Sequence, residues 1–177
     1  MGGSDVFHRS PDARATVLSA AQASARLRGD VRIGTDHLLI GVVTSGNEIA
    51  QKAGLSVEGL HEALDRLDGS ALGAFGIEAA SEALRASSPV PHPHSGRERP
   101  HRRILARHLP LNAGAKRSLK KSVRLALDHR HRHINTNHLL AALSTGGHND
   151  PAVRLLRSSA VDPADLESAV QAVLRNL

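Results

Sequence analysis

One seven-residue motif occurs twice in this chain, and the distance between its copies limits what the chain can fold into. Residues 33–39 read Ile-Gly-Thr-Asp-His-Leu-Leu, and residues 134–140 read Ile-Asn-Thr-Asn-His-Leu-Leu. The histidines are residues 37 and 138, an offset of 101 positions. Similar residues recur at this offset outside the motif, at Leu18 and Leu119, Ala25 and Ala126, Val42 and Leu143, and Thr44 and Thr145. A repeat of this length indicates a duplicated helical unit whose two copies fold alike and present two related binding sites.

The composition favours an all-α fold. Hydrophobic residues make up 40% of the 177 residues, but aromatic residues make up only 1%, and the chain has no Trp or Tyr. A core of Leu, Val, Ile and Ala suits close-packed helices, whereas strands prefer β-branched and aromatic residues. There is no cysteine, which excludes disulfides and thiolate sites and fits a reducing compartment. No apolar run approaches the ~20 residues that a membrane helix needs. The sequence therefore predicts a soluble, cytoplasmic protein.

Helix start and stop signals predict four helices in each copy. In the first copy the signals predict a helix to about Leu27, a second capped by Thr35, a third over 48–53 and a fourth capped by Ser56. The first helix is expected to bury one apolar stripe, consisting of Val17, Leu18, Ala21, Ala25 and Leu27.

The second copy repeats this organisation. Asn112 and Thr136 are predicted caps, and Pro151 and Pro163 are predicted first residues of its last two helices. Its first helix is expected to bury Leu119, Val123, Ala126 and Leu127, and its last to bury Leu166, Val170 and Leu174.

Three regions follow from these helices: a first repeat over 1–68, an extended and largely flexible linker over 69–108, and a second repeat over 109–177. Residues 79–85 could form a short helix inside the linker. Prolines and basic residues over 87–107 are typical of a flexible segment.

Charge is unevenly distributed between the two halves. Residues 1–68 carry a net charge of −2, from 7 basic and 9 acidic residues, whereas residues 69–177 carry +8, from 16 and 8. Segment 97–133 alone holds 12 basic and 2 acidic residues. Such an excess suits an anionic partner, so a basic helical protein that binds nucleic acid or another polyanion is one reading of the chain. The other reading is a solvated linker and helix face. Sequence-specific nucleic-acid binding is disfavoured because the chain offers two Phe residues and no Tyr or Trp for stacking.

The motif and its surroundings resemble the N-terminal repeat domain of Clp unfoldases, with the ClpC type closest. The resemblance rests on Thr-Val-Leu at 16–18, Ala-Gln at 21–22, the motif at 33–39, and Gly-Val-Val at 41–43. It covers about residues 6–68 and 109–175, and the first copy is expected to be the closer match, because Asn135, Asn137 and Ala142 replace family residues in the second. The resemblance implies two four-helix repeats related by a pseudo-twofold, in a stand-alone domain without the ATPase modules. Implied partners are Clp unfoldase and protease components, adaptor or substrate proteins, and cyclic-peptide antibiotics.

The motif itself is the first candidate binding site. N–H groups at a helix N-terminus favour an anion, and a carboxylate beside them can pair with a guanidinium, so the combination suits a phosphorylated arginine. The resemblance implies such a site. Its candidate residues are Thr35 and Asp36 in the first copy, and Thr136 and Asn137 in the second. Asn137 lacks the charge, so binding is expected at Asp36 only. The alternative is that these residues only cap and stabilise helices, and that His37 and His138 make structural hydrogen bonds at the edge of the core.

A second candidate site comes from the resemblance alone. The groove where the first helices of the two repeats meet is implied to bind adaptors and peptides. The residues matching that groove are Phe7, Arg14, Leu111, Lys116 and Lys120.

Catalysis is not indicated. The chain lacks a Gly-x-x-x-x-Gly-Lys-Ser/Thr loop for ATP, and the repeat supplies no consistent nucleophile or acid–base pair. The histidines over 129–133 and at 92 and 94 invite a metal, but the first three are interleaved with Arg, so no specific metal site and no cofactor is predicted. The sequence predicts a non-enzymatic binding module of the Clp system.

Overall fold

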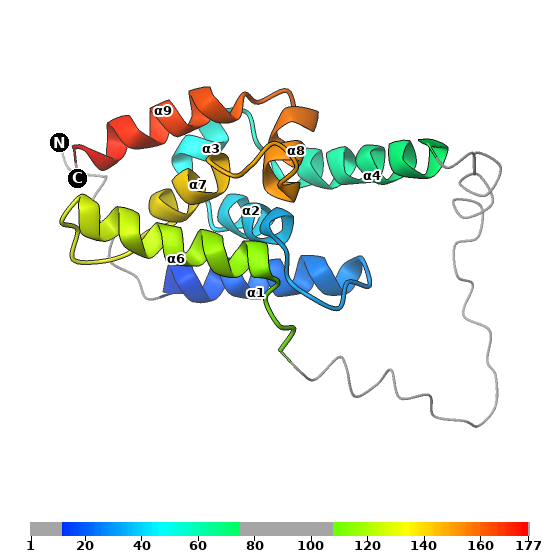
Figure 1. Ribbon diagram of the computed structural model, residues 1–177, viewed down its shortest axis with the longest axis horizontal. Coiled ribbons are helices and arrows are strands. Elements are labelled where there is room, and N and C mark those ends of the chain that lie inside the picture. The colour runs from blue at the N-terminus through cyan, green and yellow to red at the C-terminus, as the bar shows by residue number, and fades with distance from the viewer. Residues whose placement is uncertain (1–11, 75–107, 177) are drawn as a thin grey trace.

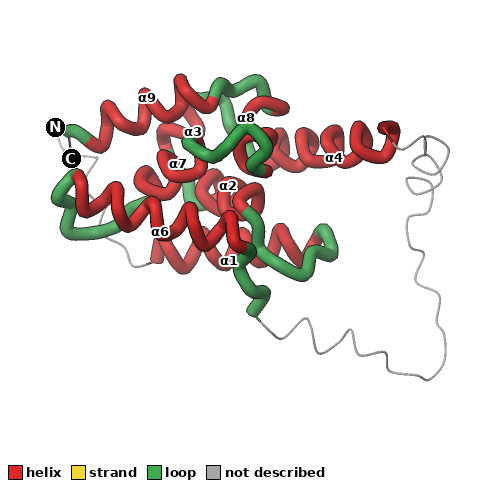
Figure 2. Tube along the Cα trace, in the orientation of Figure 1, coloured by secondary structure: helices red, strands yellow, loops and turns green. Residues whose placement is uncertain are grey.

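The computed structural model describes residues 12–74 and 108–176, which form eight α-helices (Figure 1). The helices of the first copy are α1 (Asp12–Leu27), α2 (Thr35–Thr44), α3 (Glu48–Lys52) and α4 (Val57–Ala74). Those of the second copy are α6 (Ala113–Asp128), α7 (Thr136–Ser144), α8 (Pro151–Ser158) and α9 (Pro163–Leu174). Figure 2 shows helices and loops but no strand in the described part. The predicted all-α fold of two four-helix repeats is confirmed.

The two copies share one core. Helices α2 and α7 lie at its centre and are buried along most of their length. Helix α1 packs on α2 as α6 packs on α7, while α8 crosses to contact α2 and α4, and α3 contacts α9. Because α3 and α8 each pack against the other copy, the repeats interlock about a pseudo-twofold (Figure 1).

Side-chain caps fix where several helices begin. Asn47, Asn112, Asp150 and Asp162 each accept a hydrogen bond from a backbone N–H in the first turn of the helix that follows. Such caps satisfy N–H groups that have no partner inside the helix. The predicted caps at Asn112 and Ser56 and the helix starts at Pro151 and Pro163 are confirmed.

The prediction that Thr35 and Thr136 cap their helices is wrong. The N-caps are Gly34 and Asn135, and each threonine is the first residue of its helix. The reason lies three residues after each N-cap, where a histidine ring accepts the N-cap's backbone N–H. That hydrogen bond sets the N-cap one residue earlier and leaves the threonine hydroxyls free for other contacts.

Most predicted core positions are buried, including Val17, Ala25, Ala126 and the three apolar residues expected inside α9. Two are not, because Leu27 is 80% exposed and Leu127 is 69% exposed. They follow the buried Ala25 and Ala126 by two positions and one position, and helical rotation of about 100° per residue turns them away from the core. Leu18 and Val123 are also partly open, at 36% and 40%.

A backbone contact joins the copies near the motif. The N–H of Ile33 donates to Pro110 O over 2.9 Å, and the N–H of Asn112 donates to Ile33 O over 2.9 Å. These bonds form a single parallel bridge between Ile33 and Leu111. Helix α4 continues past residue 68, to Ala74. The helix predicted over 79–85 and the linker predicted over 87–107 lie outside the described residues, so the division into repeat, linker and repeat stays a prediction.

Candidate binding sites

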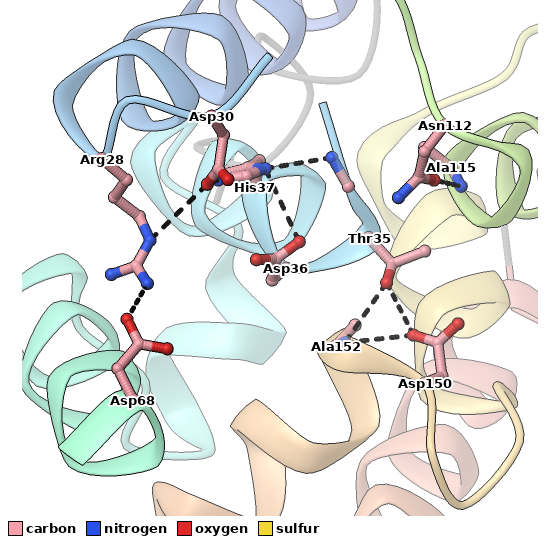
Figure 3. A network of polar contacts seen from close by, with 11 residues as sticks. Arg28, Asp30, Thr35, Asp36, His37, Asp68, Asn112, Ala115, Asp150 and Ala152 are labelled. Carbon is pink, nitrogen blue, oxygen red and sulfur yellow. Dashed lines mark hydrogen bonds and ion pairs between the residues drawn. The ribbon is translucent and has the colours of Figure 1, made fainter. Parts of the chain in front are cut away.

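His37 stands in a polar network at the N-terminus of α2 (Figure 3). It is buried, and its Nδ1 accepts the backbone N–H of Gly34 over 3.0 Å. Its Nε2 lies 3.2 Å from Asp30 Oδ2. Because Nδ1 is an acceptor, the neutral ring carries its proton on Nε2, which is buried close to the Asp30 carboxylate but outside hydrogen-bond geometry. Arg28 contacts Asp30 at 3.8 Å and Asp65 of α4 at 3.7 Å, so the network ties α1, α2 and α4 together.

Thr35 connects the two copies. Its hydroxyl donates to Asp150 Oδ1 over 2.7 Å and accepts the N–H of Ala152 over 3.3 Å, both at the start of α8 (Figure 3). Thr35 is buried, and its hydroxyl makes both of these hydrogen bonds within the protein. Of the two residues predicted to bind a ligand in the first copy, Thr35 is therefore committed to the fold.

Asp36 is the more accessible of the two. Its carboxylate folds back over Gly34, where a Cβ atom would lie 2.3 Å from Asp36 Oδ1. The same oxygen is 3.6 Å from His37 Nδ1, and the side chain is 16% exposed. Glycine at position 34 leaves the space that this carboxylate occupies.

The second copy uses its motif differently. Asn47, which caps α3, donates its Nδ2 to Thr136 Oγ1 over 2.9 Å and to Asn137 Oδ1 over 2.7 Å. Asn137 is buried, and its amide oxygen faces a protein donor. The two motif threonines thus bond reciprocally to the N-caps of the opposite copy, Asp150 and Asn47.

His138 lies in a cluster of histidines. Its Nδ1 accepts the N–H of Asn135 over 3.1 Å, and its Nε2 lies 2.8 Å from His131 Nδ1. The rings of His131 and His129 stack with centroids 5.5 Å apart, and His129 Nε2 lies 3.2 Å from Gln171 Oε1 of α9. Burial, followed by charge on His131 and then His129, lowers the pKa of His138 to about 4, against the opposing effect of the Asn135 hydrogen bond. Both motif histidines make the structural hydrogen bonds predicted for them.

An apolar groove of about 190 Å³ lies between α1, α6 and the start of α7. Its lining is mainly aliphatic, from Val17, Leu18, Leu119, Val123, Ile134 and Leu139, and its uncharged polar members are Ser122, Asn135 and the motif threonine Thr136. Two of the predicted groove residues, Arg14 and Lys120, line it. Lys116 and Leu111 are outside its lining, and Phe7 is outside the described residues.

Other kinds of site are not found in the described part of the chain. Within residues 12–74 and 108–176, no group of three His, Cys, Asp or Glu residues could hold a metal ion. None of the helices there is long and apolar enough to cross a membrane.

Sequence reasoning missed the residues that join the copies. Asn47 and Asp150 were recognisable as candidate caps, because each precedes a short helix, but only the interlocked packing gives them a second partner in the other copy. Asp30 was missed although it matches His131 at the offset of 101 residues. An acid in one copy aligned with a histidine in the other was the available signal.

The comparisons with known proteins agree with this geometry. A profile of the family described as Clp repeat (R) N-terminal domain matches residues 111–177. The crystal structure of the N-terminal domain of the Clp protease-associated chaperone ClpD from Arabidopsis thaliana superposes with a TM-score of 0.63, covering 98% of this chain and 99% of that chain at 17% identity. The fold is that of a Clp N-terminal domain. A structure titled as a preliminary investigation of a malarial protein secretion system has a TM-score of 0.54, covering 93% of this chain and 91% of that one at 15% identity.

One relative found by sequence is much longer than this chain. The chaperone protein ClpC2, chloroplastic, of Oryza sativa subsp. japonica is 24% identical over 169 residues, which is 93% of this chain. The chain spans 15% of the length of that relative. The predicted Clp resemblance is confirmed, although the first copy was expected to match best and the family profile matches the second. The changes at Asn135 and Asn137 did not prevent the second copy from matching, because the profile extends over the whole repeat and not only over the motif.

Proposed function

We propose that this Clp N-terminal domain is a non-enzymatic binding module that takes substrate or adaptor segments into the groove between α1 and α6. The observation that carries the proposal is the groove itself. Its aliphatic walls include Leu18 and Val123, which are partly exposed although they belong to helices of the core. A concave apolar site of this kind gains binding energy when a partner's side chain covers it.

The proposed role is in the Clp unfoldase–protease system. Such a module could recruit proteins to a Clp machine, compete with it for them, or sequester a cyclic peptide, and all three roles use the same groove. The cytoplasmic location predicted from the sequence stays a prediction, since the rice relative is named as chloroplastic.

Val123→Gln tests the groove directly. Gln is the residue at the equivalent position of the first copy, Gln22, and Val123 is exposed enough for the change to leave the fold intact. The matched control is Val31→Gln, at an exposed valine outside the groove. In an assay of Clp-dependent degradation of a protein substrate, we expect added wild type and the Val31 variant to change the rate, and the Val123 variant to have a much smaller effect. An equal effect of all three proteins would contradict the proposal.

A second ligand class, phosphorylated arginine, is proposed at Asp36 and not at Asn137. The support is the contrast between a partly exposed carboxylate and a buried amide that already accepts a hydrogen bond from Asn47. Charged hydrogen bonds contribute roughly 1.5–3 kcal/mol, or about ten- to a hundredfold in affinity. Calorimetric titration with free phosphoarginine should show saturable binding that Asp36→Ala removes. Binding that persists in that variant, or none at millimolar ligand, would leave the motif with a structural role only.

A further inference from the structure

Helix α6 has a cationic face that its counterpart α1 lacks. Five positions of α6 are basic, namely Lys116, Arg117, Lys120, Lys121 and Arg124. At the offset of 101 residues, the equivalent positions of α1 are small and uncharged, namely Ala15, Thr16, Ser19, Ala20 and Ala23. The two helices fold alike without these charges in one of them, so the fold does not require them.

The cationic face of α6 is not neutralised from within. All five basic side chains are exposed, and none forms an ion pair with a carboxylate in residues 12–74 or 108–176. Lys121 donates a hydrogen bond to the hydroxyl of Thr145. Like charges on one helix face repel each other by a few tenths of a kcal/mol per pair, so an anionic partner would relieve this repulsion.

The cationic face meets the apolar groove at Lys120. That residue lines the groove from α6, and Arg14 lines it from α1. The floor between them is aliphatic, and Val123 stands where the first copy has Gln22. The groove between the copies therefore combines an apolar floor with basic residues from both flanking helices.

We propose that the groove receives an acidic segment of a protein partner, in which an apolar side chain fills the floor and neighbouring Asp or Glu residues face Arg14, Lys120 and the rest of the α6 face. This proposal rests on the proposed function and names the chemistry of its ligand. A peptide fits better than nucleic acid, because the floor is aliphatic and the described groove residues include no aromatic ring on which a base could stack. Complementary charge at the rim of an interface mainly raises the association rate and gives specificity.

Three fluorescent peptides separate the apolar contribution to binding from the electrostatic one. They have the same length and the same central Leu-Phe pair, and they are flanked by Glu, Gln or Lys residues. At low salt we expect the Glu peptide to bind the wild type about tenfold more tightly than the Gln peptide, and the Lys peptide to bind most weakly. The advantage of the Glu peptide should shrink towards the Gln value at about 0.5 M salt, where exposed charges are screened. Equal affinities of the Glu and Gln peptides would overturn the acidic preference and leave the proposed function standing. If none of the three peptides binds, both proposals fail.

Variants then locate the binding. Lys120→Glu should weaken binding of the Glu peptide by about fivefold and leave binding of the Gln peptide unchanged. Lys52→Glu, an equal charge change at an exposed residue of α3, should alter neither. Val123→Gln should weaken the Glu and Gln peptides alike. A polyanion such as single-stranded DNA that binds more tightly than the Glu peptide, and that loses affinity in Lys120→Glu but not in Val123→Gln, would overturn the proposal in favour of a nucleic-acid surface.

Discussion

The first copy surrounds its buried histidine with a carboxylate and a guanidinium, whereas the second surrounds the equivalent histidine with other histidines. His37 faces Asp30, which Arg28 contacts in turn, and these positions become His138, His131 and His129 at the offset of 101 residues. Each network also reaches the last helix of its copy, through Asp65 and Asp68 in α4 or through Gln171 in α9.

What both copies retain is the hydrogen bond from the N-cap N–H to the histidine Nδ1, at 3.0 Å in the first and 3.1 Å in the second. The retained bond shapes the helix start and therefore belongs to the fold. The partner of Nε2 is free to change, and that change alters the response to acid. An ionised carboxylate presents only acceptor oxygens to Nε2, whereas His131 can accept the Nε2 proton only while its own Nδ1 is unprotonated.

The largest expected effect is a loss of stability in acid that depends on His138. Its pKa is about 4 in the folded protein and 6.5 in the unfolded chain, so between these values the unfolded chain binds the additional proton. The stabilising contribution is complete above about pH 6.5 and falls as the pH drops to about 4, by up to about 3 kcal/mol. Urea unfolding at stepped pH measures it.

His131→Asp sharpens this test because it gives the second copy the acid of the first. We expect most of the acid-dependent loss between pH 6.5 and 4 to disappear in this variant. His133→Asp, the same change at an exposed histidine nearby, should retain it. If the two variants show the same pH dependence as the wild type, His138 is not the group responsible.

The central helices α2 and α7 differ at one packing position, which is Gly41 in α2 and Ala142 in α7. A Cβ on Gly41 would lie 2.3 Å from Val17 O, so α1 and α2 approach too closely for alanine. In the second copy Ala142 is accommodated in the core. Gly41→Ala should destabilise the protein by about 2 kcal/mol through forced separation of the helices, despite the roughly 1 kcal/mol that alanine gains in helix propensity. Ala142→Gly should cost about 1 kcal/mol by propensity. Chemical denaturation measures both changes, and a more stable Gly41→Ala protein would show that α1 can move away freely.

Replacing each of the two reciprocal threonines, Thr35 and Thr136, by valine should change the free energy of unfolding by a smaller amount. Thr35→Val removes a donor to Asp150 and leaves that charged oxygen with the N–H of Ala152, a loss of about 1–2 kcal/mol. Thr136→Val removes an acceptor from Asn47, whose Nδ2 keeps Asn137 as a partner, so about 0.5 kcal/mol is expected. The free energies of unfolding of the two variants measure both losses. An equal or larger loss of stability in Thr136→Val would refute the expected difference.

The sequence was sufficient to predict the fold but not the sites. Periodicity, caps such as Asn112 and the repeat at 101 residues predict eight helices in two copies, because these signals are local or depend on alignment of the chain with itself. The exposure of Leu27 was mispredicted because the apolar stripe was extended two positions past the buried Ala25, where helical rotation turns the side chain away from the core.

The candidate sites depend on contacts that no local pattern contains. Thr35 looked like a cap because a hydroxyl before a helix usually is one, and its true partner, Asp150, is 115 residues away. The groove was placed between the first helices by family resemblance, but its walls at Val123 and Ile134 come from the packing of α6 and α7. Conversely, the offset alone aligns Asp30 with His131, so that contrast could have been read from the sequence.

Effects of at most about 1 kcal/mol are expected at the ends of the helices. Gly29 and Gly54 follow α1 and α3 with φ of 76° and 81°, and the residues in the same turns after α6 and α8 are Arg130 and Ala160, both with φ of 58°. All four turns have the paired backbone hydrogen bonds of a Schellman motif, such as Ala160 N to Arg157 O and Val161 N to Leu156 O. A side chain in this conformation costs roughly 1–2 kcal/mol, and glycine avoids that cost but loses more entropy on folding. Ala160→Gly should therefore stabilise the protein by about 0.5–1 kcal/mol, whereas the reverse change, Gly54→Ala, should destabilise it by a similar amount. Thermal unfolding of the two variants beside the wild type decides the matter. If both changes lower the melting temperature, the turn after α8 is suited to its alanine, and the two copies have diverged there in backbone preference as well as in side chains.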